Sequence, residues 1–461
     1  MKKTVSLLLA AVLALSFAAC GNDGGTEKTP IESSAVLSQP GETPQQTSSG
    51  GLTLLCDDSS SFSNHFGTES GFYYFTESGR ISDGLSGMHL MYIDYATKQE
   101  IYLCSDSGCR HDSDSCGSVY AQGEFGIDCL PFVWDNSLYV LSRDYDSDGS
   151  SSFDMMGGAS SPEATAVSLY RMCLDGSARQ KLYTFPDNVS TEKLVFGDGD
   201  ALWFVTKILE TQSDAAGSYT TSTDRSLSKF SIPENKIVDS ISLDFGDNIY
   251  HTVVGASDST FVLSGVAYQD GMSEAEAMRL SDDQWKLMYE NSSTVYSSLD
   301  AASKSKTEIY RLDNRGFSST CAVKDGALFV ADCVGGGITK INFTTGESSR
   351  LAGSSQYYIY FAMDDTLCCA NAGGADDKTL YFVDMETGEA HNSTLTNMSL
   401  GLQLDVLAEA SDNVLVVYDY DVTQSGDQYT IDRYKYALIS KDALYRSQAN
   451  YMPITMAGIG K

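Results

Sequence analysis

The sequence predicts an all-β fold built from repeated pairs of strands, and three observations lead to this prediction. From residue 51 onward, short segments rich in aromatic and β-branched residues follow polar turns that contain Asp. A second segment of alternating apolar and polar residues follows each of them. These second segments end in turns such as Thr-Gly-Glu or Asp-Gly, which is typical of a hairpin that joins two strands. Asp, Asn and Gly supply the turn geometry, and the aromatic and β-branched residues favour strands.

Seven such pairs can be counted along the chain. The first segments are residues 71–75, 135–141, 200–205, 258–263, 325–330, 365–369 and 412–417. The second segments are residues 91–100, 169–176, 227–233, 309–313, 338–347, 380–389 and 434–438, of which 227–233 and 434–438 are weaker copies. Many short strands with one turn pattern per unit predict a β-propeller, here with seven blades.

One connection departs from this regular pattern. Only residues 315–323 separate the fourth pair from the fifth, which is too short for two well-formed strands. The alternatives are an incomplete blade or a blade count that differs by one.

A small helical insertion is predicted within the fourth blade. Ser273 and Glu276 form one capping box, and Ser281 and Gln284 form a second one just before an apolar group that begins at Trp285. A helical hairpin at this place could cover one face of the propeller, although such insertions are more often structural.

The first twenty residues have the pattern of a secretory signal. Lys2 and Lys3 precede an apolar run from Val5 to Ala19, and small residues lead up to Cys20. A cysteine in the first mature position resembles the bacterial lipoprotein signal. That resemblance implies that Cys20 receives lipid and becomes the new N-terminus, on the outer face of the cytoplasmic membrane.

The segment that follows has a different composition. Residues 21–50 contain mostly Gly, Ser, Thr, Gln and Pro, and such a segment cannot bury enough apolar surface to become ordered. We therefore expect a signal peptide at 1–20, a disordered tether at 21–50 and a propeller domain at 51–461.

The charge balance excludes one class of partner. The chain has 62 acidic and 30 basic residues and a formal net charge of −32. Affinity for nucleic acid comes from clustered Lys and Arg, so we expect no nucleic-acid partner. The charge favours solubility and contact with divalent cations, and a solvated acidic coat is the plainer interpretation.

The densest group of reactive side chains lies just after the first strand pair. It consists of Cys104, Cys109, His111 and Cys116. Three thiols and one imidazole in so short a segment could fill a tetrahedral zinc site, although the spacing is not that of a standard finger. Export favours disulfides instead, with Cys56 and Cys129 as further partners. Free, packed thiols are the third alternative.

An acidic segment matches the start of a calcium loop. Asp144, Asp146 and Asp148 alternate and are followed by Gly149, as in loops whose carboxylates surround one ion. The twelfth position is Met155 rather than glutamate, so a solvated acidic loop is the competing interpretation. Zinc and calcium are thus the two cofactors that the sequence suggests.

Catalytic motifs are absent from the sequence. There is no G-x-S-x-G, H-E-x-x-H or G-x-x-x-x-G-K pattern. The histidines are His65, His89, His111, His251 and His391, and none stands in a nucleophile motif. A pair of glycosidase carboxylates would not be visible among so many acids.

The signal, the repeats and the Cys/His segment together resemble lipid-anchored β-propeller proteins of Gram-positive gut bacteria. That resemblance implies an exported, membrane-anchored propeller and brings no activity with it. The sequence favours a cell-surface module that binds a protein, peptide or carbohydrate ligand, or acts as an interaction scaffold, and is not an enzyme. The alternative is an exported hydrolase of glycans or peptides with acidic residues near the central channel.

Overall fold

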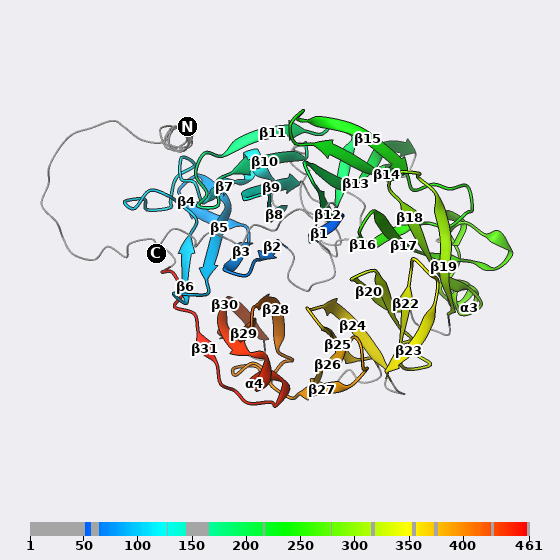
Figure 1. The fold of residues 1–461 in the computed structure, drawn as a ribbon. Coiled ribbons are helices and arrows are strands. Elements are labelled where there is room, and N and C mark those ends of the chain that lie inside the picture. Colours follow the sequence, from blue (N-terminus) through cyan, green and yellow to red (C-terminus); the bar gives the residue numbers. More distant parts are fainter. Residues whose placement is uncertain are drawn as a thin grey trace, which may run out of the picture. The chain divides into compact units, whose positions relative to one another are not determined.

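The computed structural model describes residues 51–56, 64–126, 128–143, 166–214, 217–277, 279–314, 319–352, 356–372, 377–425 and 428–458. Within these residues, antiparallel strands form seven separate sheets. Figure 1 shows the sheets following one another around a ring, as the blades of a β-propeller do. The predicted fold class and the predicted number of blades are therefore confirmed.

The first four blades contain the strands up to residue 313. Blade 1 consists of β2 (His65–Gly67), β3 (Gly71–Phe75), β4 (Gly79–Ser82), β5 (Leu85–Asp94), β6 (Gln99–Tyr102) and β7 (Val119–Ala121). Blade 2 consists of β8 (Asp128–Trp134), β9 (Ser137–Arg143), β10 (Ser168–Met172) and β11 (Gln180–Thr184). Blade 3 consists of β1 (Thr53–Cys56), β12 (Val189–Asp198), β13 (Ala201–Asp214), β14 (Gly217–Ser231) and β15 (Lys236–Ser242). Blade 4 consists of β16 (Thr252–Ser257), β17 (Thr260–Ala267), β18 (Ser293–Asp300) and β19 (Lys306–Asp313).

The last three blades have four strands each. Blade 5 consists of β20 (Thr320–Lys324), β21 (Ala327–Ala331), β22 (Ile338–Asn342) and β23 (Ser348–Ala352). Blade 6 consists of β24 (Tyr357–Ala362), β25 (Thr366–Asn371), β26 (Leu380–Asp384) and β27 (Ala390–Ser393). Blade 7 consists of β28 (Asp405–Ala410), β29 (Asn413–Ser425), β30 (Gln428–Ser440) and β31 (Met452–Pro453).

The Asp-containing turns join the first and second strands of the blades. Asp135 and Asn136 both have positive φ, 44° and 54°, between β8 and β9. Asp258 (φ 52°) and Asp325 (φ 48°) occupy the same place in blades 4 and 5. Asp and Asn tolerate this backbone region better than other residues with a side chain, and two-residue hairpin turns require it.

The second strands form the centre of the blades. Every residue of β9 and of β21 is buried. A strand that is covered on both faces needs apolar residues at successive positions, which is why these segments lack a clean alternation of apolar and polar residues. The interlocking of blade faces thus supplies most of the core.

The short connection between the fourth and fifth pairs does not have to contain two strands. The segment 309–313 belongs to the outer strand β19 and not to the third strand of blade 4, which is β18. The connection from β19 therefore has to accommodate a single strand, β20, before the turn at Asp325. The expectation of an incomplete blade is wrong, because a helical insertion separates β18 from β17 and hides the third strand in the sequence.

Strand β1 lies far from its neighbours in sequence. It pairs antiparallel with β12, the first strand of blade 3, and adds a fifth strand at that edge of the blade, with Thr53 opposite Gly197. Leu55 and Cys56 are buried there. The backbone N–H of Leu52 donates to the carbonyl of Asp258 in the β16–β17 turn.

The helical insertion of blade 4 is confirmed. The helices of the described residues are α1 (Gln122–Phe125), a 3-10 turn at Gln269–Gly271, α2 (Glu274–Ala277), α3 (Asp282–Glu290) and α4 (Lys441–Tyr445). Helix α3 begins with the predicted capping box between Ser281 and Gln284. Among the described residues, no helix has the length and apolarity needed to cross a membrane.

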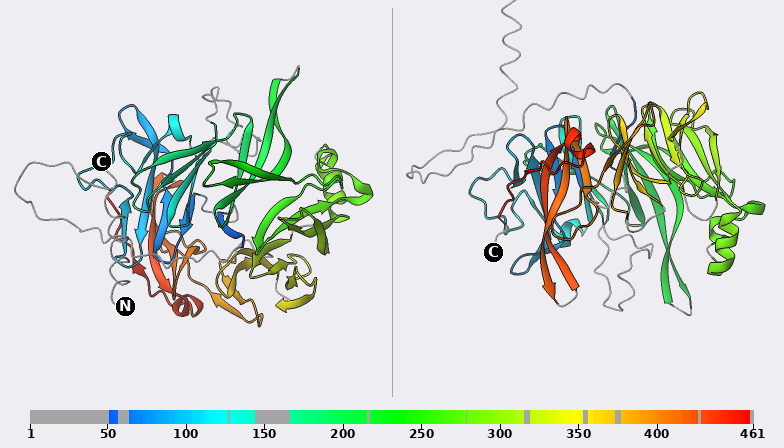
Figure 2. Two further views of the ribbon diagram at one scale, coloured as in Figure 1. Left: turned by 45° about the horizontal axis from the view of Figure 1, so that its top comes forward. Right: turned by 90° about the horizontal axis from the view of Figure 1, so that it is seen from below.

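The longest insertions leave the propeller on one side. We name this side the insertion face: it is the end of the blades where second strands connect to third strands and where the chain passes to the next blade. The β13–β14 hairpin continues to the Asp214–Gly217 pair, and the β29–β30 hairpin continues to the Ser425–Gln428 pair. Figure 2 (right) shows both hairpins and α3 extending from the same side.

The ring closes between blade 7 and blade 1. The buried carboxylate of Glu100 on β6 accepts hydrogen bonds from Tyr74 and Arg433 and from the backbone N–H of Ala457, the last at 2.7 Å. Gln99 also forms an isolated bridge with Thr455. The segment after β31 therefore runs beside the outer strand of the first blade.

Candidate functional site

The Cys/His segment interrupts the outer strand of blade 1. Strands β6 and β7 both pair with β5, and residues 103–118 connect them. The two ends of this connection meet at Leu90 of β5. The N–H of Leu103 donates to the carbonyl of Leu90 at 3.0 Å, and the N–H of Leu90 donates to the carbonyl of Ser118 at 2.7 Å. The sheet ladder is thus continuous, and residues 104–117 loop out of it; we name them the Cys/His loop.

The Cys/His loop follows a path of short turns. The N–H of Cys109 donates to the carbonyl of Asp106, and the N–H of Cys116 donates to the carbonyl of Ser113, each at 3.1 Å. His111 adopts a positive φ of 57°. These turns bring residues that are apart in sequence to the same point.

The structure brings the four predicted residues together. One ligand atom from each of Cys104, Cys109, His111 and Cys116 lies within 4.8 Å of all the others, and the group could hold a metal ion. The Nδ1 atom of His111 lies 3.3 Å from the Sγ atom of Cys116. In a tetrahedral zinc site, neighbouring ligand atoms are about 3.5–3.8 Å apart, given bonds of ~2.3 Å to sulfur and ~2.0 Å to nitrogen. In the structure the three cysteines are free thiols.

The surroundings hold the imidazole in place. The ring of His111 stacks on Tyr102, with centroids 4.3 Å apart and an interplanar angle of 15°. The Nε2–H of His89 donates to the carbonyl of His111 at 2.9 Å. Such supporting contacts around a ligand orient it toward the point that the ligands share.

The thiols differ in their readiness to ionise. Burial raises the pKa of Cys109 to about 11, and the neighbouring thiols add to this shift. Burial also opposes ionisation of Cys116, but hydrogen bonds from Ser118 and from the other two thiols outweigh it and lower the pKa of Cys116. Burial lowers the pKa of His111, which keeps the imidazole neutral and able to coordinate.

The other predicted site residues lie elsewhere. Cys56 and Cys129 are buried in the cores of blades 3 and 2 and do not belong to the cluster. Cys20 and the acidic residues Asp144, Asp146 and Asp148 lie outside the described residues. Lipidation at Cys20 and a calcium site therefore stay predictions.

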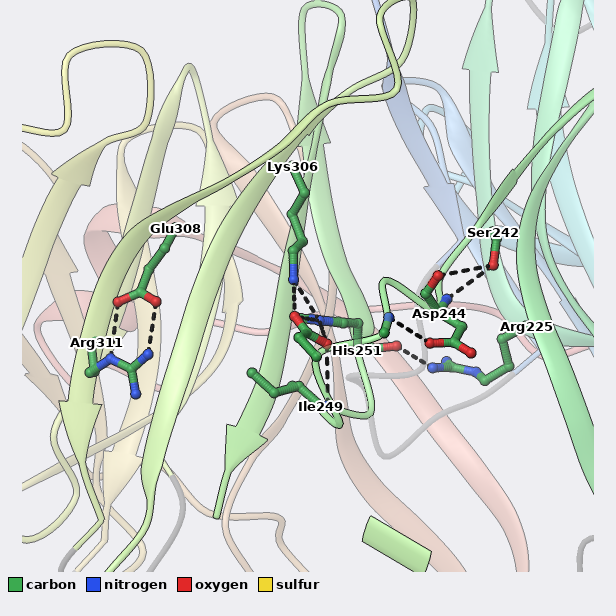
Figure 3. Close-up of polar contacts among 10 residues, drawn as sticks. Arg225, Ser242, Asp244, Ile249, His251, Lys306, Glu308 and Arg311 are labelled. Atoms are coloured by element: carbon green, nitrogen blue, oxygen red, sulfur yellow. Dashed lines mark hydrogen bonds and ion pairs between the residues drawn. The ribbon is translucent and has the colours of Figure 1, made fainter. Parts of the chain in front are cut away.

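A second polar cluster, at the junction of blades 3 and 4, was not predicted from the sequence. The fully buried ring of His251 places Nε2 3.1 Å from Asp247 Oδ2 and 2.9 Å from Lys306 Nζ. Lys306 also donates to the carboxylate of Asp247, and Arg225 donates to the carbonyl of His251. Figure 3 shows these groups converging from the linker before β16, from β14 and from β19.

The charges of this junction balance one another. Burial by itself would raise the pKa of Asp247, but hydrogen bonds from Lys306 and His251 outweigh it and lower the pKa to about 2. Burial lowers the pKa of His251, and the positive charge of Lys306 adds to this effect. The neutral ring donates Nε2–H to the carboxylate. Its Nδ1 atom has no hydrogen-bond partner among the described residues, so no hydroxyl or thiol there is placed for activation.

One carboxyl group has the raised pKa of a general acid. Burial raises the pKa of Asp405 on β28, although a hydrogen bond of 2.8 Å from the hydroxyl of Tyr420 opposes this effect. Glycoside hydrolysis needs a second carboxylate about 5–9.5 Å away. The raised pKa of Asp405 alone therefore does not establish such a pair.

Comparison with known proteins finds only distant structural similarity. No protein-family model matches the chain, and no curated protein matches its sequence. The β-propeller domain of the Trilobed protease from Pyrococcus furiosus is similar at 6% identity and a TM-score of 0.43, over 87% of this chain and 98% of that one. An oligogalacturonate lyase from Vibrio parahaemolyticus is similar at 11% identity and a TM-score of 0.39, over 70% and 74%. BamB from Moraxella catarrhalis is similar at 9% identity and a TM-score of 0.33, over 76% and 78%.

Proposed function

We propose that this protein is a lipid-anchored propeller on the outer face of the bacterial cytoplasmic membrane, where it binds a protein or peptide partner through the insertion face. The partner carries apolar side chains next to basic ones. One observation carries the proposal: most of the large exposed apolar side chains of the described residues stand on segments of this face.

Most large apolar side chains that are exposed in the described residues stand on insertions or on linkers between blades. They are Tyr250, Trp285, Leu287, Met398, Leu402 and Tyr429, whereas Val238 and Tyr358 lie in β15 and β24. Leu287 on α3 is 64% exposed, and Met398 in the linker before β28 is 69% exposed. Exposed apolar side chains that share one face favour that face as the protein-binding surface.

The charges of the same segments suggest a basic partner. Asp282, Asp283 and Glu290 are exposed on α3 beside Lys286, and Asp432 is exposed on the β29–β30 hairpin. Opposite charges around an apolar contact speed association and select the partner. Leu52 lies by the β16–β17 turn, at the other end of the blades. An anchor that precedes Leu52 in the chain therefore leaves the insertion face free to bind a partner.

A selection from a random peptide library tests the binding proposal. We expect the enriched peptides to combine Lys or Arg with aromatic or aliphatic residues. Leu287→Asp together with Tyr429→Ser should weaken their binding at least tenfold, because both side chains lose apolar contact. Val238→Asp, which changes a 43% exposed residue on β15, is the matched control and should leave binding unchanged. Equal binding by all three proteins would contradict the proposal.

The anchor has a separate test. Metabolic labelling with a fatty-acid probe should mark the wild-type protein and leave Cys20→Ala unmarked, because the lipid is attached to the thiol. Equal labelling of both proteins would remove the anchor from the proposal and leave the insertion face untouched.

The hydrolase alternative is tested on the same preparation. A panel of chromogenic glycoside, ester and peptide substrates should give no turnover above background. Turnover that disappears in Asp405→Asn would favour the alternative, since Asp405 is the described carboxyl group whose burial raises its pKa.

A further inference from the structure

We propose that the Cys/His loop binds one zinc ion through Cys104, Cys109, His111 and Cys116. This closed structural site holds together the two ends of the interrupted outer strand of blade 1. This inference is independent of the ligand that the insertion face binds. It selects one of the three alternatives that the sequence left open, and it gives the ion a mechanical role.

The loop has no apolar side chains with which to order itself. Between Cys104 and Gly117, the residues other than cysteine are Ser, Asp, Gly, Arg and His. A polar segment of this composition cannot offset its conformational entropy by burying apolar surface. Yet its chain path converges on one point, where Cys116 is buried and the other three ligands are partly buried. A bound ion supplies the stabilisation that such convergence needs.

The donor set selects the ion. Three soft thiolates and one neutral imidazole favour zinc over magnesium, calcium or manganese, which prefer oxygen ligands. The ligand atoms already surround a common centre within 4.8 Å of one another. Four protein ligands complete a tetrahedron, so no position stays open for substrate, and the ion is structural rather than catalytic.

The position of the ligands explains what the ion would hold. Cys104 directly follows Leu103, and Cys116 precedes Ser118 by two residues. Leu103 and Ser118 are the two residues that pair with Leu90 of β5. An ion shared by Cys104 and Cys116 therefore fixes both ends of the loop at the place where the strand is interrupted.

The loop ends also contact blade 2, which extends the effect of the ion. Gly176, in the β10–β11 turn, has φ +80°, and a side chain there would come within 2.7 Å of the carbonyl of Leu103. Arg179 donates from Nη1 to the carbonyls of Gly117 and Val119, at 3.4 and 3.1 Å. Ordering the loop thus supports the contact between the first two blades.

A disulfide explains fewer of the observations. Three thiols leave one sulfur unpaired after any disulfide forms, and they leave the imidazole without a role. The Nδ1 atom of His111 instead points at Cys116 from 3.3 Å. The nearby stack on Tyr102 and the hydrogen bond from His89 hold the imidazole at the cluster.

The metal content of the purified full chain tests the proposal directly. We expect about one zinc per chain, retained through dialysis without added metal, as in other four-ligand sites. Cys104→Ser and His111→Ala should each lose it. Cys173→Ser and His391→Ala change an exposed thiol and an exposed imidazole outside the cluster, and both should retain it. The proposal would be overturned if the wild-type protein purified without zinc and non-reducing peptide mapping of that protein found a disulfide between two of the three loop cysteines.

Proteolysis tests the mechanical role. The side chain of Arg110 is 86% exposed, so cleavage after it by trypsin depends on the order of the backbone. Stripping zinc with a chelator should speed cleavage of the 110–111 bond at least tenfold, and adding zinc back should reverse the effect. In His111→Ala the bond should be cleaved quickly with or without zinc. Equal cleavage of zinc-loaded and zinc-free wild type would show that the ion does not order the loop.

Discussion

Two histidines of this propeller stand in polar clusters, and their surroundings differ in what they leave open. His251 is enclosed at the junction of blades 3 and 4 by Asp247 and Lys306, whose opposite charges pair with each other, while the carboxylate accepts from the Nε2 atom of the ring. His111 is surrounded by three thiols that face a common centre and carry no counter-charge of their own. The junction thus contains its own cation, Lys306, whereas the four donors of the Cys/His loop converge with no positively charged side chain among them.

The two histidines therefore differ in whether they can bind a metal ion. Histidine is the most common metal ligand, but only when its nitrogen is accessible to an ion. At His251 the Nε2 atom is committed to a carboxylate, and the ring has no exposed surface. At His111 the Nδ1 atom faces sulfur atoms across a gap that an ion can fill.

The largest change in global stability should come from removing the enclosed ring. His251→Ala leaves a cavity and breaks a buried network, and we expect a loss of about 3 kcal/mol in the free energy of unfolding. Urea denaturation measures this value. Zinc content should stay unchanged, because the cluster at His111 is separate. A loss below about 0.5 kcal/mol would mean that the junction does not couple blades 3 and 4.

Zinc should produce the next largest effect, and only through the other cluster. At free zinc 100-fold above the dissociation constant, a ligand that binds only the folded state adds about 2.7 kcal/mol of stability. Wild type and His251→Ala should both gain stability when zinc is added. Cys104→Ser should show no zinc dependence in the same titration. A gain in Cys104→Ser equal to that of the wild type would place the zinc site elsewhere.

A smaller effect is expected from removing the cation of the junction. Lys306→Met keeps most of the aliphatic stem but removes the ammonium group, which lies 4.6 Å from the centre of the Phe245 ring and donates to Asp247. We expect a loss of about 1–2 kcal/mol, as for a partly buried charged hydrogen bond. Thermal or urea unfolding at neutral pH measures it. No change would indicate that the carboxylate is adequately solvated without Lys306.

Acidification should weaken the junction in two steps. Burial lowers the pKa of His251, so its neutral form contributes stability at neutral pH that is lost as pH falls below the ordinary histidine value near 6.5. The pKa of Asp247, lowered to about 2, contributes stability above pH 4 that is lost as pH falls toward 2. Because Asp247 is 32% exposed, we expect this second contribution to be about 1 kcal/mol after screening. The stability difference between wild type and Lys306→Met should shrink between pH 4 and pH 2, and a constant difference would contradict the assignment.

The smallest effect should come from an exposed ion pair close by. Glu308 and Arg311 form a pair across three residues of β19, with side chains 47% and 44% exposed (Figure 3). Exposed pairs contribute about 0.2–1 kcal/mol, so Glu308→Ala should cost about 0.3 kcal/mol. Stability measured at low and high salt checks this value. A loss as large as that of Lys306→Met would remove the distinction between enclosed and exposed charges.

Local patterns in the sequence predicted much of the fold. The Asp turns, such as Asp135–Asn136 and Asp258, need only their own backbone preferences, and the strands after them follow from residue type. The capping box at Ser281 likewise acts within one turn of α3. The proximity of the loop cysteines to His111 was predictable because the ligands lie within a single short segment.

Contacts between distant segments could not be predicted in this way. The third strand of blade 4, β18, was missed because a helical insertion separates it from β17. The junction at His251 joins Lys306 to His251 across 55 positions and to Asp247 across 59, and no local pattern marks such a pair. The insertion face also emerges only when the blades stand together, since its apolar residues come from several blades.

The sequence by itself determined two strand segments in most blades, the Asp-containing turns, the seven-fold repetition and the group of metal donors, because each depends on residues close together in the chain. The tertiary structure alone decided that β1 joins blade 3 opposite β12, that β6 and β7 share one partner strand around Leu90, and that His251 is enclosed rather than open. The physical reason is that strand pairing and burial are set by which surfaces meet when the blades stack, and those surfaces belong to segments that the chain brings together only on folding.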